Sequence, residues 1–442
     1  MTAHLRSLAA LASWALLHAT GAIAATPLPQ YSHDKTLGVG TCANSLCHGA
    51  IETWKDSNVL QNEYITWSRS DKHARAYRVL FNDKSKEIVK KLALPEPAYK
   101  TELCLDCHTH NPKPAQRGER YQMSDGIACE ACHGPAERWV VSHVGPEATH
   151  AQNVERGLYL TNDDVARARL CLSCHMGTPE KLVTHKLMAA GHPRMSFELD
   201  TFTHIGPHHF QIDADWIRRK GSWDGVRAWA VGQAVAAQNQ LALLLGPRGR
   251  DGLFPELVLF DCHSCHHPMG DKRNTAARLG AGPGFVRLND SSLLMLRQIA
   301  RRVVPAEADA FARQIALMHK AVASGSDALV HAKTVEQLIA DMLPKISTRR
   351  FSGDDVKAIL HGLIDDGIAG QYTDYAGAEQ AVMAVQSVAE FMGRQKLLRT
   401  RPVQPAMKRL LASVAYDEKF QPLVFERALR DLKSSVQAES NQ

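Results

Sequence analysis

The sequence lacks a long apolar run with the character of a membrane span, which argues against an integral membrane protein. The run from Leu8 to Ile23 is short for a span, follows a single arginine and ends in the small-residue pattern Ala22-Ile23-Ala24. We therefore predict a signal peptide over residues 1–25 and export to a bacterial periplasm, with an uncleaved anchor as the alternative. The run from Ala228 to Leu245 contains four side-chain amides that would be unpaired in hydrocarbon, so we expect a buried helix of a soluble fold.

The chain also lacks a large excess of charge. It carries 52 Lys and Arg residues against 46 Asp and Glu residues, which gives a formal net charge of +6. This balance argues against nucleic acid or a membrane surface as a partner. With 442 residues and 45% apolar content, the chain is long enough for two or three compact units with cores.

No cysteine stands alone: the ten cysteines form five close pairs, and a histidine follows the second cysteine of each pair. The pairs are Cys42 and Cys47, Cys104 and Cys107, Cys129 and Cys132, Cys171 and Cys174, and Cys262 and Cys265; the histidines are His48, His108, His133, His175 and His266. Four pairs have the spacing C-x-x-C-H, in which two thiols tether a porphyrin and the histidine binds its iron. The pattern predicts five covalently attached haem c groups with these histidines as proximal ligands.

Two other interpretations of the cysteines are weaker. Five disulfides would explain the even number in an exported protein, but they leave the histidines without a role. Zinc sites would use C-x-x-C units in twos, and five is an odd number. The first pair, C-x-x-x-x-C-H, has two extra residues, so the chain must bulge between the thiols, and Asn44-Ser45 is suited to a turn there. The alternative at this pair is a Cys42–Cys47 disulfide.

The residues around these motifs resemble a known family. S-D-K-H-A-R-A-Y around His73, D-G-I-A-C-E-A-C-H-G-P-A-E-R-W-V-V-S-H up to His143 and M-A-A-G-H-P around His192 resemble the multihaem cytochromes c related to the nitrifiers' tetrahaem electron acceptor of hydroxylamine oxidoreductase. F-D-C-H-S-C-H-H-P-M at the fifth pair is similar to a segment of longer pentahaem relatives. The resemblance covers roughly residues 40–270 and implies a mainly helical fold with closely packed, mostly bis-histidine haems.

Within that resemblance, His73, His143 and His192 are the first candidates for distal iron ligands. His185, His208, His209 and His267 form a second set. We expect the others before Gly270 to face solvent or bond to backbone: His33, His110, His150, His204 and His263. A methionine such as Met176 or Met188 could also be a ligand, but core filling is the favoured interpretation.

We predict four segments: a signal peptide (1–25), a pentahaem cytochrome c domain (26–270), a linker (271–288) and an all-α domain (289–442). A helix is expected from about Trp223 to Leu245, ended by Gly246-Pro247. After residue 288 apolar residues follow helical spacing, which indicates five to seven helices. One of them should start at Ser352, where S-G-D-D is typical of a capping box.

The favoured function is a periplasmic electron carrier that passes single electrons between a donor and an acceptor redox protein. The rival is a haem enzyme with one open iron, acting on hydroxylamine, nitric oxide, nitrite or a sulfur oxyanion such as tetrathionate. In a third hypothesis, the protein is a docking subunit whose C-terminal helices bind a partner, and the haems only relay electrons. The basic residues Arg394, Lys396, Arg399 and Arg401 would suit an acidic partner, but a solvated helix end is the favoured interpretation.

Overall fold

The structure is a computed structural model that describes residues 27–55, 57, 59–247, 255–266 and 286–440. Within these ranges its regular elements are all helices, and it contains no β-strand, only two isolated bridges that pair Thr36 with Arg117 and Phe260 with Leu288. The predicted mainly α fold is therefore confirmed. The signal peptide, His267 and most of the linker predicted at 271–288 lie outside the described residues.

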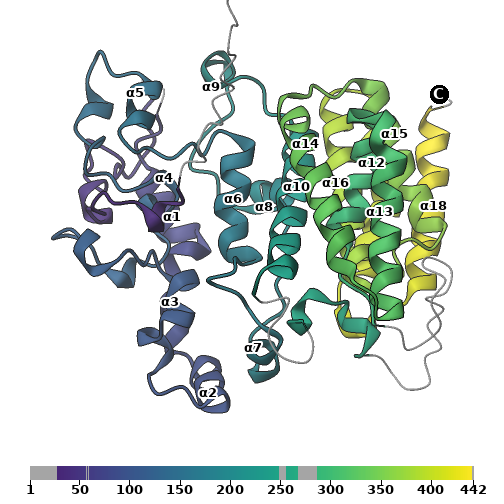
Figure 1. Cartoon of the computed structure of the whole chain (residues 1–442). Helices are drawn as coiled ribbons and strands as arrows, with labels where there is room; N and C mark the ends of the chain where they lie inside the picture. Colours follow the sequence, from purple (N-terminus) through teal and green to yellow (C-terminus); the bar gives the residue numbers. More distant parts are fainter. Residues whose placement is uncertain (1–26, 56, 58, 248–254, 267–285, 441–442) are drawn as a thin grey trace, which may run out of the picture.

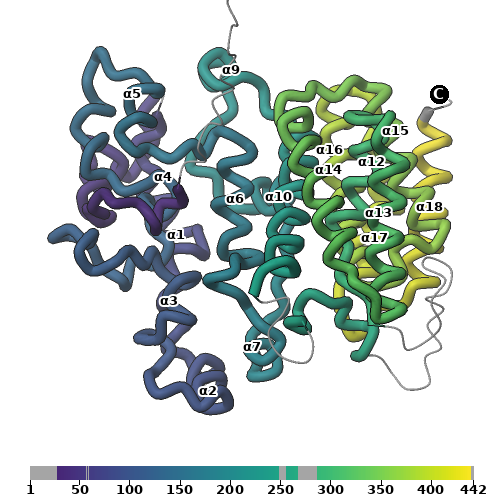
Figure 2. Tube along the Cα trace, viewed as in Figure 1, coloured from purple at the N-terminus to yellow at the C-terminus, as the bar shows by residue number. Residues whose placement is uncertain are grey.

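The N-terminal half consists of short helices joined by irregular chain (Figure 1, purple to teal; Figure 2). Its α-helices are α1 (Glu63–Ser70), α2 (Asp83–Leu92), α3 (Glu102–His108), α4 (Cys129–His133), α5 (His150–Glu155), α6 (Asp164–His175), α7 (His185–Ala190), α8 (Leu199–Ile205) and α9 (Ala214–Lys220). Single-turn 3₁₀ helices lie between them. Buried apolar side chains are few here: two small clusters form around Ile88 and around Leu80. Such small clusters cannot by themselves stabilise a fold of this size.

The C-terminal half is a bundle of long helices that stand side by side (Figure 1, green to yellow). These are α10 (Gly225–Leu245), α12 (Ser291–Val303), α13 (Pro305–Ser324), α14 (Ala328–Thr348), α15 (Gly353–Ile368), α16 (Tyr375–Arg394), α17 (Thr400–Ser413) and α18 (Pro422–Ser440). From 286 to 440 the structure has seven α-helices, as the apolar spacing predicts. The capping box at the start of α15 is also confirmed, with Ser352 and Asp355 each bonding the other's backbone N–H.

Helix α10 is the buried helix expected between Trp223 and Leu245, and its apolar residues are covered on all sides. No helix in the part of the chain that the structure describes is long and apolar enough to cross a membrane. At Gly232 a side chain would bring its Cβ within 2.7 Å of the Leu199 Cβ, so this glycine allows α8 to pack directly on α10. The amide of Gln233, one of the four that argued against a span, donates to Gln380 of α16 at 2.9 Å.

One large hydrophobic core joins the two halves. It includes Ala168 and Leu172 of α6, Leu199 of α8 and most of α10, and it continues through α12 to α18. Helix α10 packs against α14, α12 and α16 on one side and against α6 and α8 on the other. The boundary predicted at 271–288 therefore separates two stretches of sequence that share a core.

Candidate haem-binding site

Three of the five cysteine pairs lie on helices that end at the histidine. Helix α3 ends at His108, α4 at His133 and α6 at His175, so each C-x-x-C-H motif forms the last turns of a helix. Cysteines three residues apart on a helix are neighbours on one face, which places both thiols on the same side. These are the second, third and fourth attachment sites in chain order.

The first and fifth sites have other local structures. At the first, the predicted bulge is present: the Asn44 side chain accepts from the Leu46 N–H at 2.8 Å, and its carbonyl accepts from Cys47 at 2.9 Å. This Asx turn takes up the two extra residues. At the fifth, the 3₁₀ helix η11 (Cys262–Ser264) brings the His266 N–H to the Cys262 carbonyl at 2.8 Å.

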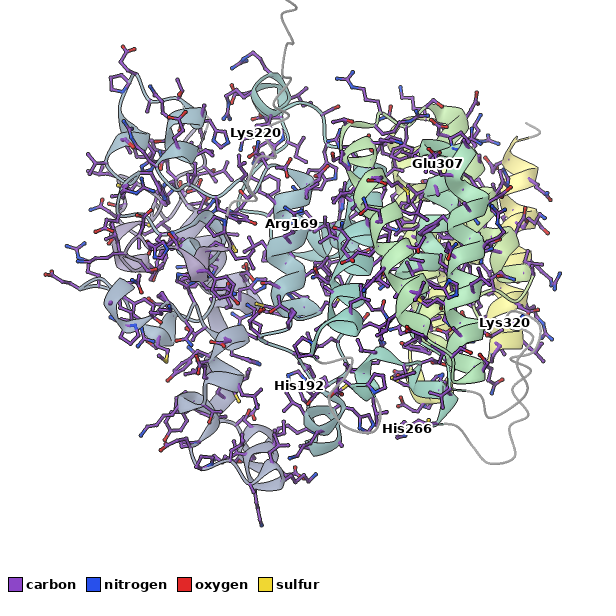
Figure 3. The ribbon with its side chains drawn as sticks, viewed as in Figure 1. Arg169, His192, Lys220, His266, Glu307 and Lys320 are labelled. Carbon is purple, nitrogen blue, oxygen red and sulfur yellow. The ribbon has the colours of Figure 1, made fainter. Side chains whose placement is uncertain are left out.

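Each of the five predicted proximal histidines faces a second histidine from elsewhere in the chain. The ring centres are 6.3 Å apart for His48 and His143, 6.4 Å for His108 and His192, 6.1 Å for His133 and His209, 6.0 Å for His175 and His73, and 6.0 Å for His266 and His185. All five partners were among the predicted distal candidates. The labels of Figure 3 show His192 and His266, which belong to two different pairs.

These separations fit one iron between each pair of rings. A metal–imidazole bond of about 2.0 Å, as measured for zinc, and a ring centre about 1.2 Å behind its nitrogen place the two centres about 6 Å apart. Distance alone is not sufficient, because His204 and His208 are also 6.4 Å apart and neither follows a cysteine pair. The combination of a facing histidine with an adjacent cysteine pair is what fits a covalently attached haem.

Hydrogen bonds at Nδ1 orient five of these ten rings. The Nδ1–H of His48 donates to Glu63 at 3.0 Å, that of His73 to Asp71 at 2.9 Å, and those of His108, His143 and His192 to backbone carbonyls at 2.9, 2.6 and 2.8 Å. A donor at Nδ1 leaves the lone pair on Nε2, which is the arrangement found around metal-binding histidines.

The surroundings of the rings also set their protonation. Burial lowers the pKa of both His133 and His175 to about 4, so these imidazoles are neutral at neutral pH, as a ligand must be. Hydrogen bonds to Glu63 and Asp71 instead raise the pKa of His48 and His73.

Several attachment sites lie next to one another. Cys129 raises the pKa of the Cys42 thiol, which indicates that the first and third predicted sites are close, and Cys174 raises the pKa of Cys107, which indicates the same for the second and fourth. Lys181 donates to the Cys174 sulfur at 3.2 Å. All ten cysteines are free thiols in the structure, including the pair for which a disulfide is the alternative.

The remaining candidates lie away from these pairs. His208 is exposed and its ring centre is 5.1 Å from that of Phe210, whereas its neighbour His209 faces His133. His33 and His150 are exposed, and the His204 Nδ1 donates to the Asp200 carbonyl, as expected. Outside the five pairs, the described residues contain no group of three or more metal-binding side chains.

Two histidines depart from the expectation of solvent or backbone contacts. His110 is buried and its Nε2 lies 2.9 Å from the Thr36 hydroxyl, while the buried His263 pairs with Asp417. Burial lowers the pKa of His110 to about 4. Their partners are far away along the chain, so no local pattern could have indicated these contacts.

Comparison with known proteins gives one match. Residues 41–134 match the family model described as Cytochrome c554 and c-prime. The matched segment contains the first three attachment sites and supports a multihaem c-type cytochrome with a role in electron transfer. No curated protein and no solved structure matches the chain.

Proposed function

We propose that the chain is an exported pentahaem c-type cytochrome that carries electrons between two redox proteins through bis-histidine haems. The observation that supports this most directly is the geometry of the five histidine pairs, each beside a cysteine pair and each with ring centres 6.0 to 6.4 Å apart. The family match over residues 41–134 supports the same class of protein independently.

In this proposal the cysteines tether five haems and the ten paired histidines bind their irons. A haem supplies an iron that alternates between the ferric and ferrous states, one electron at a time. The paired histidines would hold the iron, and two imidazole ligands would favour a low potential, because methionine is the ligand that raises it. Glu63, Asp71 and the backbone carbonyls at Nδ1 hold the rings so that little rearrangement accompanies a change of charge.

The proximity of the predicted sites supports a route for electrons between them. The pKa of Cys42 is raised by Cys129 of the third site, and the pKa of Cys107 is raised by Cys174 of the fourth site. Burial raises the pKa of Cys132, and the nearby Cys171 and Cys174 raise it further, which indicates that the third and fourth sites are also close. Helix α7 connects the fifth site to the second. It begins at His185 of the fifth histidine pair and ends two residues before His192 of the second pair.

The enzyme hypothesis requires an iron with an open face. The facing histidine at every attachment site favours the carrier, because an imidazole in the sixth position blocks access to a small substrate. Export to the periplasm rests on the predicted signal peptide. Cysteines in that oxidising compartment normally form disulfides, so ten cysteines without a disulfide fit thiols that are used to attach haem.

The test is the mass of the mature protein together with electron paramagnetic resonance of its ferric form. We expect the mass of five covalently attached haems, cleavage near residue 25, and low-spin signals alone. A mass equal to the bare polypeptide would refute the proposal. One high-spin iron in five that binds cyanide would instead support the enzyme.

A further inference from the structure

The loop that carries the fifth attachment site is fixed by a carboxylate directly before its first cysteine. Asp261 caps η11: its carboxylate accepts from the His263 N–H at 3.1 Å and from the Ser264 hydroxyl at 3.0 Å. The Asp261 N–H donates to the Arg287 carbonyl at 2.8 Å, next to the bridge between Phe260 and Leu288. The attachment loop is thus tied to the segment that leads into the C-terminal helices.

Arg287 connects this loop to α16 through buried charges. One of its guanidinium nitrogens lies 3.0 Å from an Asp261 oxygen and 2.8 Å from an Asp374 oxygen. The three side chains are only 4 to 6% exposed. Asp374 is the N-cap of α16 and also accepts from the Gly377 N–H at 2.6 Å. A buried arrangement of three charges costs desolvation energy and is poor at raising stability, so another role is the better explanation.

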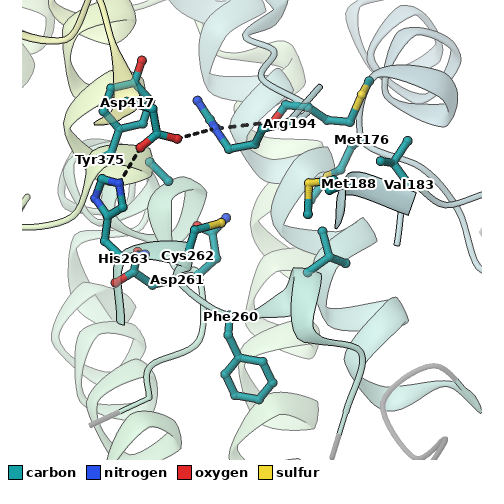
Figure 4. A pocket seen from close by; sticks show the side chains of 14 residues that line it. Met176, Val183, Met188, Arg194, Phe260, Asp261, Cys262, His263, Tyr375 and Asp417 are labelled. Atoms are coloured by element: carbon teal, nitrogen blue, oxygen red, sulfur yellow. Dashed lines mark hydrogen bonds and ion pairs between the residues drawn. The ribbon is translucent and has the colours of Figure 1, made fainter. Parts of the chain in front are cut away.

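A second set of contacts links the same region to the second site. His263, between the two cysteines of the fifth pair, bonds to Asp417 of the 3₁₀ helix η12 (Asp417–Lys419). Asp417 pairs with Arg194 at 3.3 Å (Figure 4). Arg194 also pairs with Glu379 of α16 at 2.8 Å. Arg194 is two residues after His192 of the second histidine pair.

Arg194, His263 and Asp417 line one wall of a pocket. Cys262 opens onto the pocket, and Met176, Met188 and Met195 form much of its apolar wall. Of its polar lining, Tyr375 comes from α16 and Asp417 from η12.

We propose that Asp261, Arg287 and Asp374 form a positioning triad that seats the fifth haem on the C-terminal helices and sets its potential apart from the other four. This inference rests on the proposed function. The triad carries two negative charges and one positive charge at a buried place next to the tether, where charges act strongly on one another. Removal of the cation should favour the more positive ferric iron and lower the potential of this haem. Removal of a carboxylate should raise it.

The experiment uses the holoprotein with Arg287→Gln, Asp374→Asn and Arg287→Lys, followed by spectroscopic potentiometric titration. Asparagine remains a good N-cap, so the Asp374 variant keeps the start of α16. Arg409→Gln is the control, because Arg409 makes an exposed pair with Asp431 on α17 and α18. The haem content of each protein is measured by mass.

We expect all variants to hold five haems. In Arg287→Gln the oxidised-to-reduced ratio of one haem should rise about tenfold at fixed potential, which is about 59 mV for a one-electron couple. The ratio should fall in Asp374→Asn and stay near that of the unaltered protein in Arg287→Lys and the control. If Arg287→Gln loses its fifth haem, the potential of that haem in Asp374→Asn alone tests the inference.

The inference is overturned if neither variant moves a single haem, or if all five move together as in a general loosening of the fold. Failure of the proposed function has a different signature, because the unaltered protein would then lack the mass of five haems before any substitution is made.

Discussion

Replacing His209 with alanine should open one iron in five, whereas replacing the adjacent His208 should open none. His209 faces His133 at 6.1 Å between ring centres, and it is partly buried. His208 is exposed and lies beside Phe210. The two variants differ by one position in the sequence and remove the same number of atoms, so the pair is a matched control for general effects of losing an imidazole.

The size of the effect follows from the five histidine pairs. Loss of one distal ring leaves His133 as the single axial ligand of the third haem, so one iron of five becomes high-spin and about a fifth of the low-spin signal disappears. The assay is electron paramagnetic resonance of the ferric protein, with cyanide titration to count open irons. We expect one cyanide per chain for His209→Ala and none for His208→Ala.

The double variant excludes a rearrangement in which His208 takes the vacant position. If His209→Ala alone stays low-spin but the double variant does not, the neighbour has moved in, and the pairing with His133 still holds. A high-spin iron in His208→Ala with an unchanged His209→Ala would refute the pairing drawn from the structure.

Three further predictions concern other parts of the chain. His73→Ala should create a high-spin iron at the fourth site, because the ring centre of His73 lies 6.0 Å from that of His175. Electron paramagnetic resonance would detect the high-spin signal. Burial raises the pKa of Glu198 from 4.5 to about 7, so the folded chain holds a proton there that the unfolded chain has lost. Its contribution to stability should fall by about 3 kcal/mol as the pH rises from about 4.5 to 7 and then stay constant, and Glu198→Gln should remove this slope from thermal unfolding curves. Ser352→Ala should lower stability by about 1 kcal/mol through loss of the capping box with Asp355, seen as a lower Tm beside an unchanged haem spectrum.

The local backbone structure of the cysteine motifs could be predicted because everything that defines it is local. Two thiols and an imidazole within a few residues need only a short helix or turn, and even the bulge at Asn44 follows from the count of residues between Cys42 and Cys47. The distal ligands are different. His143 and His48 come from separate segments, so the sequence supplies candidates but no pairings. Nothing in the local pattern distinguishes His208 from His209, because only the folded backbone decides which ring turns inward.

The C-terminal helices were predictable for a different reason: the spacing of their apolar residues shows which face of each helix is buried. Val356, Ile359, Leu360 and Leu363 mark one face in the sequence, and all four are buried in the structure. The buried polar contacts were not predictable. Their partners meet only after the helices have packed, as the triad around Arg287 illustrates.

The fifth site differs from the others in what holds it. The second, third and fourth sites are built on short α-helices of the N-terminal half, whereas the loop at 261–266 is held by Arg287, by Asp374 of α16 and by Asp417 of η12. Helix α6, which carries the fourth site, shares one hydrophobic core with α10 and the C-terminal bundle. The bundle is therefore joined to the fourth and fifth cysteine pairs by packing and by buried charge. A substitution within it can act on the sites by moving a loop or a helix, without touching a haem ligand.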